Sequence, residues 1–196
     1  MNKGPLLIGL TGLAGSGKSS VAGILRRRYG GRVVPFASPL KKMLAALGVP
    51  KACLYGADKE RPLDLLRGHT ARHAMQTLGT EWGRGLIGDD FWLCAWADAV
   101  SAVPRDVLVV VADDVRFANE AECIRDNGGL VLRVVRPSGR STAGGHASET
   151  GDFAADAMIL NNGTKQQLGR TVAGIVDPIL SRRTCRRSDK ASTDRA

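Results

Sequence analysis

The chain has 196 residues, a formal net charge of +9 and a pI near 9.9. This length gives one domain with a substantial core and an inserted region, and it excludes two independent domains. The excess positive charge fits anionic partners such as nucleotides. No apolar run approaches a membrane span and no signal peptide precedes the first strand, so we expect a cytoplasmic protein with no membrane partner. The four scattered cysteines lack metal-ligand spacing and are expected to be reduced thiols.

The first informative stretch begins at residue 6. Residues 6–11, LLIGLT, form the short apolar run that is typical of a buried parallel strand. Residues 12–19, GLAGSGKS, match the phosphate-binding loop pattern G-x-x-x-x-G-K-[ST], and apolar residues at helical spacing follow. This order predicts an ATP or GTP site, with Lys18 on the β- and γ-phosphates and Ser19 on Mg²⁺. The predicted nucleotide contacts are Gly12, Ala14, Gly15, Ser16, Gly17, Lys18, Ser19 and Ser20.

The middle of the chain predicts a short strand and then mainly helices. Residues 32–36 are expected to form the second strand, and Ser38 to cap a helix that runs to Leu47. Residues 48–70 are expected to be irregular because glycine and proline interrupt them. A helix over residues 70–78 and a glycine-rich turn up to Gly88 should follow. The next helix, capped by Asp89 or Asp90, carries a stripe that favours core packing over base stacking: Trp92, Trp96, Val100 and Val103.

The second half of the chain alternates strands and helices. Strands are predicted at residues 107–112, 130–135 and 157–160, with a helix over 117–127 between the first two and a polar loop at 136–151. Thr164 and Gln167 form a capping box that opens a final helix ending near Leu180. The basic tail, residues 181–196, lacks apolar periodicity and is predicted to be disordered. The pattern predicts a doubly wound α/β fold with about five parallel strands in one domain, residues 1–180.

Polar residues follow most of the predicted strands. Ligands of such sheets bind at the carboxyl ends of the strands, so these residues are expected to share one composite site. Asp113 and Asp114 compete for the Mg²⁺-holding role, and capping of the next helix is the structural alternative. Arg116 is expected to bind phosphate, although an ion pair with a buried carboxylate would also explain it.

Residues 37–92 are longer than one crossover helix requires and predict an insert that binds a second substrate. Within it, amide, hydroxyl and guanidinium groups are candidates to contact a base, sugar or phosphate, although single residues of these types are more often solvated surface groups. The acceptor-binding candidates are Ser38, Lys41, Arg72, Gln76, Thr80, Arg84 and Trp92, together with Arg116. His69 and His73 lack a third ligand and do not predict a metal site.

Four segments carry a family resemblance: residues 36–41, 76–84, 114–121 and 146–149. They resemble the phage-type deoxynucleoside monophosphate kinases, a branch of the adenylate-kinase-like P-loop kinases, over residues 6 to about 180. The resemblance implies transfer of the ATP γ-phosphoryl group to a deoxynucleoside 5′-monophosphate, in the host cytoplasm if the protein is phage-encoded. It implies catalytic roles for Lys18, Asp114, Arg116 and Arg136.

The resemblance also divides the remaining candidates by role. Arg84 and Arg116 would hold the acceptor phosphate, while Gln76 and Thr80 would line the base or sugar pocket. Residues 136–151, including Arg136 and Arg140, would form a short lid, and residues 161–164, with Asn162 and Gly163, would lie by the adenine.

Two alternative functions stay open from the sequence. A dephospho-coenzyme A kinase-like enzyme would phosphorylate a hydroxyl and would need a general base, but Ser38 stands where its carboxylate is expected. A nucleic-acid-associated ATPase module would use the basic tail, but the absence of a nucleic-acid-binding motif argues against such a partner. The accepted bases, the selection of deoxyribose over ribose and the assembly, including a homodimer, are left open.

Overall fold

The computed structural model describes residues 4–137 and 153–193, with side chains as far as Arg183. The chain divides into two compact units. One comprises Met1–Val33 and Val103–Ala196 and is called the sheet unit here; the other, Val34–Ala102, is called the helical unit. Each unit is described by itself.

The sheet unit contains a five-stranded parallel sheet in the order β2-β3-β1-β4-β5. Its strands are β1 (Leu6–Thr11), β2 (Arg32–Val33), β3 (Val109–Ala112), β4 (Leu130–Val135) and β5 (Ala157–Leu160). The central strand β1 is buried along its whole length, as its apolar sequence predicts. The predicted parallel α/β sheet is therefore confirmed.

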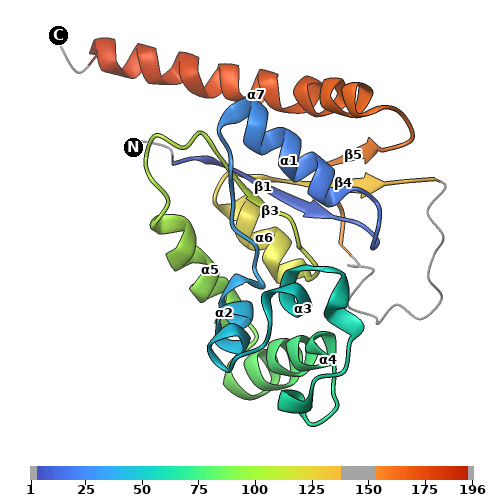
Figure 1. The fold of residues 1–196 in the computed structure, drawn as a ribbon. Coiled ribbons are helices and arrows are strands. Elements are labelled where there is room, and N and C mark those ends of the chain that lie inside the picture. Colours follow the sequence, from blue (N-terminus) through green and yellow to red (C-terminus); the bar gives the residue numbers. More distant parts are fainter. Residues whose placement is uncertain (1–3, 138–152, 194–196) are drawn as a thin grey trace. The chain divides into compact units, whose positions relative to one another are not determined.

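Three helices cover the two faces of this sheet: α1 (Lys18–Tyr29), α6 (Ala118–Asp126) and α7 (Lys165–Thr193). Helices α1 and α7 pack on one face and α6 on the other (Figure 1). Alternate strand residues such as Leu6, Ile8 and Leu10 form one core with the apolar sides of α1 and α7. On the other face, a side chain at Gly9 would overlap Ile124 of α6, so glycine permits the close approach of this helix.

Helix α7 corrects the sequence prediction at the carboxyl end of the chain. The expected end near Leu180 is wrong, because the helix continues to Thr193 through the segment predicted to be disordered. Residues 181–193 contain no glycine or proline and are rich in arginine, which has a high helix propensity. Arg183 also anchors this segment, since its guanidinium donates to the carbonyls of Gly128 (2.6 Å) and Gly4 (3.3 Å).

The helical unit consists of helices joined by short turns. They are α2 (Ser38–Ala46), α3 (Lys51–Tyr55), η1 (Ala57–Glu60), η2 (Asp64–Leu66), α4 (Ala71–Gln76), η3 (Thr77–Ile87) and α5 (Phe91–Ser101). One core cluster joins α2, α3 and α4 around Leu44, Leu54 and Ala71. On α5, Trp96 stacks on Phe36 with ring centroids 4.5 Å apart, which confirms the core role of the tryptophan stripe.

Several boundaries in the helical unit differ from the sequence prediction. Residues 48–70 contain three short helices where irregular chain was expected, and Ser38 is the first residue of α2 with Ala37 as its cap. The predicted turn through Gly83, Gly85 and Gly88 is instead the π-helix η3, which continues α4. Over the described residues, we find no helix with both the length and the apolar character needed to cross a membrane.

Candidate active site

The glycine-rich loop between β1 and α1 has the backbone conformation of a phosphate-binding loop. Gly12, Gly15 and Gly17 all adopt positive φ angles, of 131°, 77° and 105°. These angles are favourable only for glycine, and they allow successive N–H groups to line one concave surface. A side chain at Gly12 would also overlap the carbonyl oxygen of Val134 in β4, so the loop lies directly against the sheet.

Two polar side chains of this loop, those of Ser16 and Lys18, are candidates to contact a bound anion. The Lys18 ammonium donates to the carbonyls of Gly12 (2.5 Å) and Leu13 (3.0 Å), which holds it over the loop. The Ser16 hydroxyl is buried and has no hydrogen-bond partner among the described residues. An unpaired buried hydroxyl is unfavourable unless a ligand or water satisfies it, and the amino end of a helix such as α1 carries a partial positive charge that favours an anion. The loop therefore fits the phosphates of a nucleotide.

The end of β5 supports the same loop. Asn161 is 6% exposed, its side-chain Nδ2 donates to the Ser16 carbonyl at 2.8 Å, and its backbone N–H donates to the Val135 carbonyl at 2.7 Å. Asn162 and Gly163, the predicted adenine neighbours, are exposed. The predicted capping box at the start of α7 is confirmed, because Gln167 Oε1 accepts from the Thr164 N–H (2.7 Å) and Thr164 Oγ1 accepts from the Gln167 N–H (3.2 Å).

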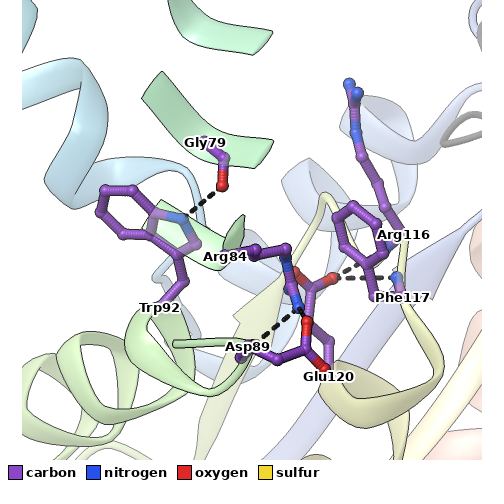
Figure 2. A network of polar contacts seen from close by, with 7 residues as sticks. All are labelled: Gly79, Arg84, Asp89, Trp92, Arg116, Phe117 and Glu120. Atoms are coloured by element: carbon purple, nitrogen blue, oxygen red, sulfur yellow. Dashed lines mark hydrogen bonds and ion pairs between the residues drawn. The ribbon is translucent and has the colours of Figure 1, made fainter. Parts of the chain in front are cut away.

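The turn after β3 carries Asp113, Asp114 and Arg116. Both aspartates are half-buried and Arg116 is exposed. The turn is fixed from within the sheet unit by Glu120 of α6, a carboxylate that is only 4% exposed. Glu120 Oε2 accepts from the N–H groups of Arg116 (2.8 Å) and Phe117 (3.2 Å), as Figure 2 shows. Glu120 is the third residue of α6, and its side chain caps the amino end of this helix as the N3 glutamate of a capping box does.

Arg136, at the end of β4, is the described part of the predicted lid. Its guanidinium lies beside the glycine-rich loop, with Nη2 3.9 Å from the position that a Cβ of Gly17 would occupy. The rest of the predicted lid, including Arg140 and His146, lies outside the described residues.

In the helical unit, Gln76, Thr80 and Arg84 recur at intervals of four along the continuous helix α4–η3. This spacing places them near one another along the helix surface, with Gln76 half-buried and Thr80 exposed. π-helical segments are rare, and they occur often at functional sites. Segment η3 therefore supports a functional assignment for this run.

Arg84 and Trp92 have defined partners within the helical unit (Figure 2). Arg84 Nη1 donates to the backbone carbonyl (2.9 Å) and to Oδ1 (3.1 Å) of Asp89, which holds a guanidinium whose side chain is only 7% exposed. The Trp92 indole is 3% exposed, donates to the Gly79 carbonyl at 2.7 Å and fills the space that a side chain at Gly83 would need. These contacts give Trp92 a packing role beside the predicted acceptor residues.

The remaining acceptor candidates are dispersed over the helical unit. Ser38 lies in the first turn of α2, and the Lys41 ammonium lies 4.8 Å from the centroid of the Tyr55 ring. Arg72 forms an ion pair with Glu60. Among the described residues no group of three or more His, Cys, Asp or Glu side chains could hold a metal. A metal at Ser19 and Asp114 would therefore take most of its ligands from phosphate and water, as Mg²⁺ commonly does.

Comparison with known proteins decides the family. The model of the deoxynucleotide monophosphate kinase family matches residues 60–172. A putative deoxynucleotide monophosphate kinase of Acanthamoeba polyphaga mimivirus is 32% identical over 189 residues, which cover 88% of this chain and 96% of the relative. This chain belongs to the deoxynucleotide monophosphate kinase family.

Two further comparisons accompany this assignment. The deoxynucleoside-5′-monophosphate kinase of Escherichia phage T5 is 35% identical over 86 residues, and the match covers 41% of this kinase and 34% of the phage protein. The crystal structure of TT1252 from Thermus thermophilus covers 90% of this chain and 98% of its own, with 19% identity and a TM-score of 0.49. The sequence matches confirm the family resemblance and the class of enzyme, a nucleoside monophosphate kinase.

Two supporting contacts beside the candidate site were not predicted from the sequence. Glu120 stands three residues after the helix cap Phe117, which is half of a capping-box pattern, but an apolar cap gives no signal for it. Asn161 was expected near the adenine, and no local pattern links it to a loop at the other end of the chain. The Asn161 contact joins residues 145 positions apart, so only the folded sheet unit brings them together, whereas the Glu120 contacts are local to the start of α6.

Proposed function

We propose that this kinase transfers the γ-phosphoryl group of ATP to the 5′-phosphate of a deoxynucleoside monophosphate in the cytoplasm. The products are ADP and the deoxynucleoside diphosphate. The observation that carries the proposal is the family membership, taken together with a phosphate-binding loop whose Ser16 hydroxyl and Lys18 ammonium are poised for an anion. The same loop supports a nucleoside triphosphate as donor, and we propose ATP.

In this proposal the donor phosphates lie on residues 12–20. Lys18 exchanges its loop carbonyl partners for the β- and γ-phosphates, and its charge stabilises the transferring group. Ser19 and Asp114 would hold Mg²⁺, which neutralises phosphate charge when bound. Arg136, next to Gly17, would add a second cation on the donor side, and Asn162 with Gly163 would contact the adenine.

On the acceptor side, Arg116 and Arg84 would bind the monophosphate. A guanidinium presents two N–H groups in a plane that matches two phosphate oxygens, which lysine does not reproduce. Gln76 and Thr80 would contact the base or sugar, with Ser38, Lys41, Arg72 and Trp92 as further candidates around them. An acceptor phosphate oxygen attacks the γ-phosphorus in line and displaces ADP, so positioning and charge stabilisation suffice without a covalent intermediate.

The family membership favours this proposal over a dephospho-coenzyme A kinase-like reaction, which phosphorylates a hydroxyl group. The test is thin-layer separation of products from γ-labelled ATP and a panel of acceptors: the four common deoxynucleoside monophosphates, the matching ribonucleotides and dephospho-coenzyme A. Label in at least one deoxynucleoside diphosphate supports the proposal. Label only in a hydroxyl acceptor, or only in inorganic phosphate, would contradict it.

A further inference from the structure

Asn161 joins three structural parts of the sheet unit. It follows β5, its backbone N–H is bonded to Val135 at the end of β4, and its side-chain amide is bonded to the carbonyl of Ser16 in the glycine-rich loop. The side chain is buried, so this amide–carbonyl bond is shielded from water. A buried amide bond of this kind is costly to break, because both polar groups would lose their partner.

The bond fixes the orientation of one peptide in the loop. The Ser16 carbonyl and the Gly17 N–H belong to the same planar trans peptide, in which the two groups point in opposite directions. Holding the carbonyl toward Asn161 therefore directs the Gly17 N–H away from Asn161. Without this bond, the peptide before a glycine could rotate with little steric resistance, because Gly17 at φ 105° has no side chain to restrict it.

The contact is also close enough to dictate the residue at position 17. A Cβ at Gly17 would overlap Asn161 Nδ2. Glycine at this position is favoured by its φ angle, and a Cβ there would also displace the amide from its bond to the Ser16 carbonyl. The loop and the asparagine form one packed unit with no space for a side chain between them.

We propose that Asn161 is a positioning residue of the ATP site, which holds the Ser16–Gly17 peptide so that the Gly17 N–H is oriented to bind the triphosphate. Asn161 acts through this peptide and does not itself need to touch the nucleotide. The inference rests on the proposed use of ATP, and it adds a determinant of donor affinity at the end of β5.

The test measures ATP and tripolyphosphate binding by titration calorimetry, in Mg²⁺ and without acceptor, for the wild type and three variants. Asn161→Asp keeps the shape but turns the donor into an acceptor facing a carbonyl, and Asn161→Ser removes the amide without burying a charge. Asn127→Ser is the matched control, because Asn127 Nδ2 also donates to a backbone carbonyl, that of Cys123 at 2.8 Å, next to the amino end of β4. Folding is checked by circular dichroism and thermal unfolding.

We expect both Asn161 variants to raise the Kd for ATP and for tripolyphosphate by roughly 10-fold or more, the scale of one well-placed hydrogen bond, with the control unchanged. A purely structural role would instead lower the fraction of binding-competent protein, seen as a reduced stoichiometry with an unchanged Kd. That result, or wild-type affinity in Asn161→Ser, would overturn the proposal. Failure of the wild type to bind ATP would instead contradict the proposed function itself.

Discussion

Replacing Glu120 tests whether this carboxylate holds the turn after β3 in the conformation that the reaction needs. In the sheet unit, the Glu120 carboxylate accepts two backbone N–H groups, from Arg116 and Phe117. We expect Glu120→Ala to destabilise the fold and to lower kcat/KM for the deoxynucleotide, since Asp114 and Arg116 lie in the turn that this carboxylate fixes. Glu120→Gln should have a smaller effect, because a neutral amide oxygen still accepts.

The magnitude follows from the two bonds. A hydrogen bond to a charged group contributes about 1.5–3 kcal/mol, and the bond of 3.2 Å is the weaker of the two, so the alanine variant should lose about 2–4 kcal/mol. At about 2–4 °C per kcal/mol for a chain of this size, Tm should fall by roughly 5–15 °C. Glu120→Gln should lose about half as much, since neutral hydrogen bonds are about half as strong.

The assay combines urea unfolding with steady-state kinetics for both substrates. Glu122→Gln is the matched control, because Glu122 lies on the same helix and is exposed. A loss below 1 kcal/mol in Glu120→Ala, or equal losses in the Glu120 and Glu122 variants, would refute the capping role. A kcat/KM for the deoxynucleotide equal to that of the wild type would refute its link to the site.

The remaining predictions concern single side chains. Lys18→Ala should keep the fold and reduce phosphoryl transfer on the order of 10²-fold or more at saturating ATP, as expected for the loss of one charge-stabilising donor; near-normal turnover would contradict its role. Arg116→Lys should lower kcat/KM for the deoxynucleotide by roughly 10- to 100-fold with little change in ATP affinity, and loss of ATP affinity alone would place Arg116 on the donor side. Burial and a hydrogen bond to Asp177 raise the pKa of Tyr29 to about 12, so stability linked to its protonated form should be lost between about pH 10 and pH 12. In a Tyr55→Phe variant, Tyr29 is the one remaining tyrosine, so ultraviolet titration measures the pKa of its phenol alone. A pKa near 10, or a pKa that does not fall when Asp177→Asn is added, would contradict the assignment. Arg183→Ala should destabilise the fold by about 1 kcal/mol through its bonds to Gly4 and Gly128, whereas Arg182→Ala, with an exposed side chain, should not; equal unfolding free energies would show that the bonds contribute nothing.

Most of the fold could be predicted because the apolar runs in the sequence coincide with the buried strands of the sheet. The strands at residues 130–135 and 157–160 were predicted with their observed bounds, since apolar runs between turn residues define them. The second strand is shorter than predicted and ends at Val33. The cause is tertiary: the next residue, Val34, belongs to the helical unit, where its carbonyl accepts from Trp96 Nε1 at 2.8 Å.

The glycine-rich segment after Gln76 shows why other elements were missed. Glycines at 79, 83 and 85 indicate a turn when read locally. In the structure Gly83 lies inside a helix, where the absence of a side chain makes room for the Trp92 indole. A glycine required for close packing and a glycine required for a turn look identical in sequence.

For the candidate site, the structure bears on the glycine-rich loop and its supports. The phosphate-binding loop followed from a motif whose spacing and context are both specific. The supports of the loop and of the turn after β3, Asn161 and Glu120, are single polar residues whose partners are backbone groups. The bond from Asn161 to a distant backbone carbonyl leaves no pattern in the sequence, and the apolar cap Phe117 hides the capping-box pattern that Glu120 completes.

The central claim is that a phosphate group moves from ATP to the phosphate of a deoxynucleotide. Phosphorus NMR of a reaction containing the kinase, ATP, Mg²⁺ and one accepted deoxynucleoside monophosphate detects the new phosphoanhydride bond directly. The account predicts that the monophosphate signal is replaced by the two coupled signals of a diphosphate, in step with the conversion of ATP to ADP. Accumulation of inorganic phosphate with the deoxynucleotide unchanged, for every base in the panel, would contradict it.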